Sequence, residues 1–511
     1  MALNTTLVTS SITNSSDGIY EVTGWNPSDT NRGSIDILWS CCITIILCCW
    51  VSTFPNVTSL NDKWYHPLVD KFNLACIGFL GPNYLFAIAL GQLSSARRSV
   101  RLFRELSRFS QGRKWTLTHG FFADMGGFTL VSPDHPPFPV NAEQLHYLVK
   151  NGHVDFPSMT KADIKALSKT DGLSKLIVFW QVFWFSASEL QRVKEGFPTT
   201  TFELTALSFS LTMLITSLCW YAKPTISSST MLYTKDGRSI ECIRTTARDS
   251  THPGLPSAWY RTPLDFISPY RRFRVDVHWS YYAQLTYMVN VPLFTREVKA
   301  RPWDRVPSDA WLVIDRDLLG PAFLVILAFS VSPLIAWNFY FPSEAERIIW
   351  RACSVYHAVF SLGLGVYYIC AALRLNTTSS EKGNHPQPPS SSPSPKAQQR
   401  ESTIERPALE ETLPSKPCCD VEAASVSSGQ VHAKVEGVIH RGIRWLRSWR
   451  NISPDGDPDM TIGLRATFFP LVGTFLYIFS RLFFYVEDFV SIRQQPVDIY
   501  KAMNKFVPFM N

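Results

Sequence analysis

Residues 35–54 read IDILWSCCITIILCCWVSTF. The only charged residue in this stretch is Asp36, close to its start. A helix of about 20 residues rises roughly 30 Å, which is the thickness of a bilayer's hydrocarbon core. A surface helix of a soluble protein would alternate apolar and polar residues, because one side of it faces water. This stretch therefore predicts a membrane-spanning helix.

Six further apolar blocks follow along the chain. They cover 73–92, 173–190, 202–221, 318–341, 350–373 and, within the longer region 462–490, about 466–486. The block at 73–92 contains Gly81-Pro82 and predicts a kinked span. The block at 173–190 carries Lys175 and Gln181, so an amphipathic helix in the membrane interface is the alternative there. The pattern predicts an all-α polytopic membrane protein with about seven transmembrane helices, or six if 173–190 lies at the interface.

The blocks divide the chain into transmembrane segments, large loops and one linker. We expect a flexible N-terminal tail (1–34), two spans (35–93), a basic loop (94–172), spans three and four (173–222), a second basic loop (223–317), a helical hairpin (318–373), a linker (374–437), and a last segment (438–511). The linker is rich in Pro and Ser and is expected to be disordered, because it cannot bury enough apolar surface. Residues 438–450 predict a basic amphipathic helix on the membrane surface, ahead of the last span.

The positions of Lys and Arg set the expected orientation. The loops 94–172 and 223–317 carry eleven and fourteen of these residues, whereas 55–72 has only Lys63 and Lys71. Because basic loops stay in the cytoplasm, we expect both large loops inside and 55–72 outside. Seven crossings then place the N-terminus inside. The candidate glycosylation sites Asn4 and Asn14 favour an exported N-terminus instead, which needs a different number of crossings; Asn56 is a third candidate.

The net charge of +7 is assigned to the cytoplasmic membrane face. The expected partners are membrane lipids, including anionic lipids at that face, and a lipophilic small molecule. Nucleic acid is excluded as a partner, because no base-reading or base-stacking fold accompanies the charge. Most cysteines lie in or beside the apolar blocks, whereas Cys418 and Cys419 form a pair in the linker that is a candidate for lipidation.

The familiar catalytic motifs are missing from the sequence. It has no phosphate loop of the GxxxxGK type, no HExxH, no CxxC, no GxSxG and no DDxxD cluster. The absence of these motifs excludes nucleotide-driven pumps, and it disfavours standard zinc hydrolases and metal-dependent enzymes that act on prenyl diphosphates. We therefore expect neither a cofactor nor a bound metal.

Five polar residues are weak catalytic candidates, each with a structural alternative. His119 and Asp124 occur in HGFFADMGGF (119–128), which suits acid–base chemistry or, more simply, a glycine-rich turn. His357 lies inside the sixth block and would face a cavity or make one interhelical hydrogen bond. Glu203 begins the fourth block and Glu487 follows the last, where both fit interface charges as well as a substrate entrance.

Several motifs together resemble a family of uncharacterised fungal multi-pass membrane proteins. The main ones are GSIDILWSC (33–41), WTLTHGFFADMGGF (115–128), FPTTTFEL (197–204), and Arg481 followed by Glu487. The resemblance extends over nearly the whole chain. It implies a multi-pass membrane fold and a fungal origin, and it supplies no catalytic residue. The family usually shows a longer, histidine-containing proline motif after the first span than residues 54–57 (FPNV) here.

Three classes of function fit these observations. An accessory or scaffold membrane protein of specialised metabolism would have no inward-facing polar cluster. A membrane-embedded enzyme acting on a terpenoid or lipid would bring the five candidates His119, Asp124, His357, Glu203 and Glu487 together in one cavity. A transporter or receptor is the third class, and no internal repeat supports it. The endoplasmic reticulum and the plasma membrane suit the chain equally.

Overall fold

A computed structural model gives the structure of the protein. It describes residues 11–14, 20–27, 32–106, 112–168, 172–250, 252–253, 255–267, 274–288, 294–310, 312–383, 461 and 463–501. The chain divides into two units, Met1–Leu373 with Arg450–Asn511, and Arg374–Trp449. Most of the predicted linker (374–437) and the predicted surface helix (438–450) lie outside the described residues. Residues 374–383 do not form a linker, since they continue helix α12 (Glu344–Gly383).

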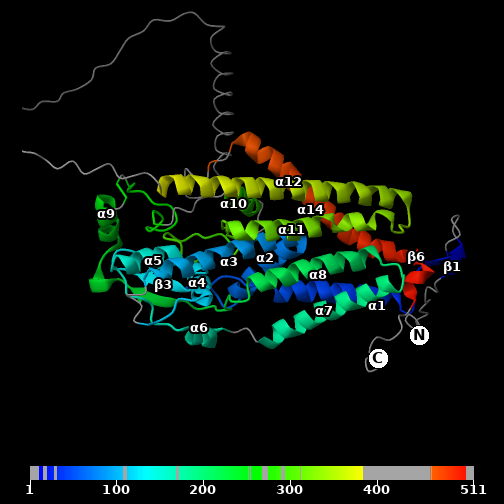
Figure 1. Ribbon diagram of the computed structural model, residues 1–511, viewed down its shortest axis with the longest axis horizontal. Coiled ribbons are helices and arrows are strands. Elements are labelled where there is room, and N and C mark those ends of the chain that lie inside the picture. Colours follow the sequence, from blue (N-terminus) through cyan, green and yellow to red (C-terminus); the bar gives the residue numbers. More distant parts are fainter. Residues whose placement is uncertain are drawn as a thin grey trace, which may run out of the picture. The chain divides into compact units, whose positions relative to one another are not determined.

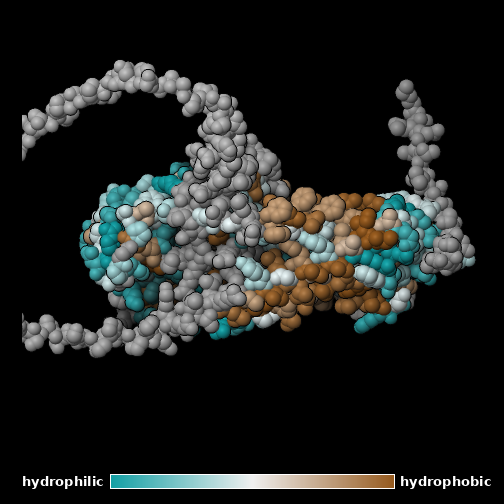
Figure 2. All heavy atoms as spheres, turned by 90° about the horizontal axis from the view of Figure 1, so that it is seen from above, coloured by the Kyte–Doolittle hydropathy of each residue, from teal (hydrophilic) through white to brown (hydrophobic). Residues whose placement is uncertain are grey.

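Five helices within the described residues are long and apolar enough to cross a membrane. They coincide with five of the seven predicted blocks and are α1 (Ser34–Val51), α8 (Thr201–Cys219), α11 (Arg316–Ile335), α12, and α14 (Leu464–Val490). Large apolar side chains on them, such as Ile46, Leu324 and Phe475, are more than half exposed. Figure 2 shows apolar side chains gathered over the middle of one face of the first unit, with polar side chains toward both ends. This distribution is compatible with a membrane protein.

Helix α7 (Gly172–Lys194) corresponds to the third predicted block but is not among these five helices. It packs along α1, where Gln181 Nε2 donates a 3.2 Å hydrogen bond to Thr44 Oγ1. Val182 and Phe185 are buried, while Ile177 and Trp180 on other faces are exposed. Lys175 lowers the mean hydropathy of α7, yet the outward surface of α7 is apolar.

The second predicted block is not one kinked span. It is divided between α2 (His66–Leu80) and α3 (Pro82–Arg104), and the helix breaks at Gly81, whose φ of −150° and ψ of 80° are not helical. Pro82 then begins α3, which suits a residue without a backbone N–H. The two helices pack so closely that a Cβ on Gly78 would lie 2.8 Å from Leu85. The break therefore produces a helical hairpin.

Both ends of this hairpin lie beside the second basic loop. Near the start of α2, Arg296 binds Asp62 and Asp70, and near the end of α3, Arg98 donates to the carbonyl oxygen of Val313 at 2.8 Å. The hairpin thus enters the helical bundle and returns to the same end. The expectation that 55–72 lies opposite the loop 223–317 is wrong, because the chain turns back at Gly81 instead of crossing.

The two ends of the bundle can be recognised from their contacts. The terminal end is defined by Ser34 and Tyr500, whose side-chain oxygens are 3.2 Å apart. The lobe end is defined by Phe54 and Lys223, where Nζ donates to the carbonyl oxygen at 2.7 Å. Helices that run between these ends in the described part of the chain are α1, α7, α8, α11, α12 and α14.

A small sheet closes the terminal end. Strands β1 (Ser11–Asn14), β2 (Tyr20–Thr23) and β6 (Gln494–Pro496) pair antiparallel in that order. Along the chain, β6 lies between the turns η4 (Ser491–Arg493) and η5 (Val497–Tyr500). The first 34 residues are therefore not wholly a flexible tail. Glu203 and Arg192, on α8 and α7, lie at this end and bind residues of the two terminal segments.

The two basic loops form a folded lobe with its own sheet. The first supplies α4 (Leu117–Asp124), β3 (Phe128–Val131), β4 (Phe138–Pro139), α5 (Ala142–Lys150) and α6 (Lys161–Leu167); the second supplies β5 (Thr230–Tyr233), η1 (Lys235–Gly237) and α9 (Ile240–Ser250). The strand order is β4-β3-β5, with β3 antiparallel to β4 and parallel to β5. The all-α prediction is wrong for the lobe and for the terminal sheet.

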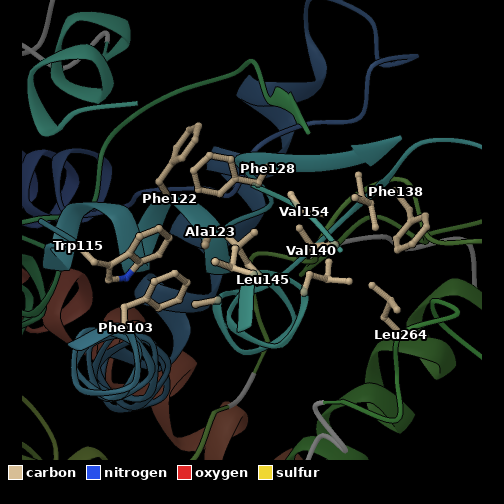
Figure 3. Packing of buried hydrophobic residues seen from close by; sticks show 14 of the residues in the cluster. Phe103, Trp115, Phe122, Ala123, Phe128, Phe138, Val140, Leu145, Val154 and Leu264 are labelled. Atoms are coloured by element: carbon tan, nitrogen blue, oxygen red, sulfur yellow. The ribbon is translucent and has the colours of Figure 1, made fainter. Parts of the chain in front are cut away.

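The core of the lobe is aromatic and aliphatic (Figure 3). Phe103 at the end of α3 stacks on Trp115 with ring centroids 3.8 Å apart, and Phe122 meets Phe128 edge-on at 4.9 Å. Leu264, from the second loop, is buried in the same cluster. Further along that loop lie α10 (Arg274–Met288) and, after α11, the turn η2 (Ala336–Asn338). Both loops therefore belong to one folded structure at the lobe end.

Candidate functional site

The five catalytic candidates do not meet in one cavity. His119 and Asp124 lie on α4 in the lobe, Glu203 and Glu487 lie toward the terminal end, and His357 lies inside the helical bundle. The convergence expected of an enzyme that uses all five is therefore not found.

His119 and Asp124 both support the backbone of the lobe. His119 Nδ1 lies 2.7 Å from Thr116 Oγ1 at the start of α4, and its Nε2 lies 3.2 Å from the carbonyl oxygen of Met159. Asp124 accepts a 3.0 Å hydrogen bond from the backbone N–H of Ala142, the first residue of α5. Burial lowers the pKa of His119 and raises the pKa of Asp124 to about 6. Their side chains point to different partners, so they form no acid–base pair with each other.

Glu203 is part of a buried network of charges at the terminal end. It is fully buried, forms an ion pair with Arg32, and accepts a 2.8 Å hydrogen bond from the backbone N–H of Thr200. Arg192 of the neighbouring α7 donates to the carbonyl oxygen of Ile499 at 2.9 Å. A carboxylate held by a cap and an arginine fixes the start of α8. Glu487 is also buried at this end, on α14.

The glycosylation and lipidation candidates have different outcomes. Asn4, Cys418 and Cys419 lie outside the described residues, and Asn14 ends strand β1. The side chain of Asn56 is buried, and its Nδ2 donates to the carbonyl oxygen of Pro307 at 3.0 Å. A glycan would have to be attached to this nitrogen, so the folded structure argues against Asn56 as an acceptor.

Lys223 forms a polar cage that the sequence did not indicate. Its Nζ donates to Phe54 O at 2.7 Å and to Asn56 Oδ1 and Gln92 Oε1 at 2.9 Å each. Trp220 also donates to Gln92 Oε1 at 3.0 Å. Burial lowers the pKa of Lys223 to about 7. All three ammonium donors are used, so the cage joins α3 and α8 to the segment after α1.

His357 lies behind Tyr477, one of the residues that border a cavity. The cavity has a volume of about 60 Å³ and opens among α3, α11, α12 and α14. Its wall is almost wholly apolar, with Leu319, Phe323 and Leu364 among its residues. Asn83 and Tyr477 also border it, both buried. His357 stacks behind Tyr477, with ring centroids 4.8 Å apart.

A cluster of polar groups stands at this place in the bundle. Asn83 Nδ2 donates to Ser330 Oγ at 3.2 Å, and His357 Nδ1 lies 3.2 Å from the carbonyl oxygen of Ser330. Because a carbonyl oxygen only accepts, Nδ1 must carry the proton and Nε2 is left as an acceptor. One turn beyond Tyr477, Arg481 donates to Tyr485 Oη at 2.7 Å. We call Asn83, Ser330, His357, Tyr477 and Arg481 the polar cluster.

Several atoms of the polar cluster lack partners within the described part of the chain. They are Asn83 Oδ1, His357 Nε2, Tyr477 Oη and Arg481 Nε. A buried polar group without a hydrogen bond costs about 1–3 kcal/mol. Proteins therefore rarely keep several such groups together unless something binds them. Apart from His357, sequence reasoning missed these residues, although Asn83 follows a Gly-Pro break and Arg481 is a charge inside an apolar block.

No arrangement for a metal ion accompanies the cluster. Within the described ranges, no group of three or more His, Cys, Asp or Glu side chains is positioned to hold a metal. The cavity is thus bordered by the amide of Asn83 and the phenol of Tyr477 in an apolar wall, and the imidazole of His357 lies behind Tyr477.

The chain is thus a largely helical protein with five helices suited to spanning a membrane and a polar cluster between them. Residues 3–243 match the model of a family of unknown function (DUF8562). No curated protein and no solved structure matches the chain. The matched region includes Asn83 and the α2–α3 hairpin but ends before α11, so most of the polar cluster lies outside it. The match is consistent with the resemblance to an uncharacterised family.

Proposed function

We propose that the protein crosses the membrane six times, through α1, α7, α8, α11, α12 and α14. Five of these helices have suitable length and hydropathy, and α7 lies beside α1 with an apolar outer face. The α2–α3 hairpin enters the membrane from the lobe end and returns. The lobe contains both strongly basic loops, so it lies in the cytoplasm. This arrangement exports β1 and β2 and removes the conflict between Asn14 and the basic loops.

Epitope insertion tests this topology. Gly152 in the lobe and Gly196 between α7 and α8 are exposed, and a Cβ at either position would meet no atom within 4 Å. An epitope after Gly152 should become accessible only when the plasma membrane is selectively permeabilised. An epitope after Gly196 should be accessible in intact cells if the protein is in the plasma membrane, and protected even after this permeabilisation if it is in the endoplasmic reticulum. Access to both from the same side would exclude a crossing by α7.

We further propose that the protein binds a lipophilic molecule in the cavity and holds it by the polar cluster. The observation that carries this proposal is an apolar cavity bordered by Asn83 and Tyr477, whose buried side-chain oxygens Oδ1 and Oη have no hydrogen-bond partner among the described residues. Ligand sites are commonly apolar pockets with a few convergent polar groups. A scaffold would have no such cluster, so the cluster favours ligand binding over the scaffold function. Identifying the ligand would then show whether the protein chemically converts it, transports it or senses it.

Two glycines of α12 provide a matched test. Gly365 is buried on the cavity wall, and a Cβ there would lie 3.6 Å from the ring of Phe323. Gly363, two residues earlier, is exposed, and a Cβ would meet nothing within 4 Å. Gly365→Leu should fill the cavity and reduce the lipophilic molecules that copurify with the protein, as measured by native mass spectrometry. Gly363→Leu should retain them. Equal retention by both variants would exclude the cavity as the binding site.

A further inference from the structure

At the lobe end of the bundle, α1 and α2 present aromatic side chains to the outside. Trp64, just before α2, is 88% exposed, and its neighbour Tyr65 and Trp50 near the end of α1 are also exposed. Two lysines lie over these rings: Lys71 Nζ is 4.8 Å from the ring centroid of Trp50, and Lys63 Nζ is 5.9 Å from that of Tyr65. We call Trp50, Lys63, Trp64, Tyr65 and Lys71 the aromatic–basic surface.

The two lysines differ from the arginines near the end of α3, which are largely neutralised within the protein. Arg98 and Arg101 both pair with Asp315, at 3.0 and 3.1 Å. In the described part of the chain, Lys63 and Lys71 contact aromatic rings instead of forming ion pairs. Their charges are therefore available to an anion outside the protein.

The outer side of α2 continues the aromatic–basic surface with apolar residues. Leu68 and Phe72 are more than half exposed, Phe79 is also exposed, and spacings of four and seven place all three on one side of the helix. The opposite side is buried and includes Leu74 and Ile77. If the hairpin enters the membrane from the lobe end, this apolar side faces acyl chains and the aromatic–basic surface lies at the level of the headgroups.

We propose that the aromatic–basic surface binds anionic phospholipids of the cytoplasmic leaflet. Tryptophan and tyrosine concentrate at membrane interfaces, and lysines beside them attract anionic headgroups. A protein partner fits this surface less well, because lysine is depleted from protein–protein interfaces. The inference rests on the proposed entry of the hairpin from the lobe end. It adds an anchor that holds the start of α2 at the bilayer surface.

A lipid titration of the full-length protein tests the preference for negative charge. Phosphatidylserine and phosphatidylcholine with identical acyl chains are added to the delipidated protein in detergent, and bound lipids are counted by native mass spectrometry. The native protein should prefer phosphatidylserine. The double variant Lys63→Gln, Lys71→Gln should reduce this preference about tenfold or more, because each lysine near an anionic surface contributes a factor of about five.

Two exposed lysines of the lobe provide the matched control. Lys150 lies on α5 and Lys165 on α6, and replacing both by glutamine removes the same charge. This control variant should keep the native preference for phosphatidylserine. The absence of a preference in the native protein, or the same preference in both double variants, would overturn the inference.

A photoreactive side chain identifies what covers Trp64 in a membrane. On irradiation of native membranes, the variant Trp64→benzoylphenylalanine should form adducts with phospholipid, detected by mass spectrometry. Tyr233→benzoylphenylalanine, at an exposed position of β5 in the lobe, should form none. Adducts of the Trp64 variant with a second copy of the chain or with another protein would overturn the inference.

The same label in place of Phe72 separates the inference from the proposed topology. Lipid adducts at Phe72 without any at Trp64 would overturn the anchor and leave the hairpin in the membrane. The absence of lipid adducts at both positions would overturn the anchor and the entry of the hairpin together.

Discussion

Asn83 Nδ2 donates to Ser330 Oγ across 247 positions of sequence, and this bond ties the tip of the α2–α3 hairpin to α11. The carbonyl group of the same serine meets His357. One residue thus connects the hairpin, α11 and α12 at the cavity. The position of the hairpin therefore sets the position of Asn83 Oδ1, and changes where the hairpin is anchored should affect the cavity.

Arg296→Gln should loosen the hairpin. Arg296 is held by both Asp62 and Asp70, and its removal leaves Asp62 with His66 and Asp70 with the more distant Arg305. Because the pair is only partly buried, the loss should stay below the roughly 3–5 kcal/mol of a fully buried pair. The thermal midpoint of the purified protein should fall, and retention of copurifying lipophiles should fall with it. Arg347→Gln, which removes an exposed pair with Glu344, is the control and should change neither.

The same ion pair should make the stability of the folded protein depend on pH in the acid range. Burial alone would raise the pKa of Asp62, but hydrogen bonds and charge from Arg296 lower it to about 2. The stabilisation is present above the ordinary value near 4 and is lost as pH falls toward 2. Arg296→Gln should therefore flatten the decline of stability in this range. An unchanged acid profile would show that Arg296 does not hold the carboxylate.

Lys223→Met should change how stability depends on alkaline pH. The pKa of Lys223 is about 7 in the folded protein and near 10.5 in an unfolded chain. Between these values the unfolded chain binds the additional proton, so stability of the native protein should rise with pH. The variant should lose this rise and be less stable overall, because three buried oxygens lose a donor.

Lys235→Met is a suitable comparison, since Lys235 is exposed and pairs with the exposed Asp155. Its pH profile, followed by thermal unfolding from pH 7 to 10, should match that of the native protein. A Lys223→Met profile with the native slope would mean that Lys223 keeps an ordinary pKa.

Asp124→Asn should stabilise the lobe near neutral pH. Burial raises the pKa of Asp124 to about 6, so the folded carboxyl holds its proton at pH values where the unfolded one has lost it. Native stability should then fall as pH rises from about 4 through 6. The asparagine keeps an oxygen for the N–H of Ala142 and should gain about 1–3 kcal/mol at pH 7.5, with no gain below pH 4. A loss of stability at pH 7.5 would show that the lobe uses the charge.

Gly91→Ala should disturb the packing of α3 against the segment before α11. A Cβ at Gly91 would lie 2.5 Å from the backbone oxygen of Leu312, and backbone cannot move aside cheaply. Gly320→Ala places the same methyl group where nothing lies within 4 Å and should be neutral or stabilising. Thermal midpoints of the two variants should therefore shift in opposite directions, or only that of Gly91→Ala should fall.

Apolar length predicted the five long helices well, because the constraint acts on each segment separately. It could not predict whether the chain continues or turns back at Gly81-Pro82. That outcome depends on contacts such as Asp70 with Arg296, 226 positions away. The same limit explains why 55–72 was placed at the wrong end.

The lobe and the cavity were harder to predict for a related reason. Strand β3 has four residues, too few for a clear alternating pattern, and its parallel partner β5 comes about a hundred residues later. At the cavity, His357 was recognised as an ionisable residue in an apolar block. Asn83 and Tyr477 gave no comparable signal, since their importance lies in hydrogen bonds that are left unmade.

The parallel pairing of β3 with β5 has a consequence for biosynthesis. Phe128 pairs with Thr230, and the whole of α7 and α8 is synthesised between them. Strand β3 is synthesised first, and its apolar neighbours stay uncovered until β5 emerges from the ribosome. If α7 and α8 both cross the membrane, as we propose, the two strands can meet only after both helices have been inserted, because a single crossing would leave the strands on opposite sides of the bilayer. In that topology, closure of the sheet depends on correct insertion of the helix pair, and a failed insertion leaves an exposed strand edge.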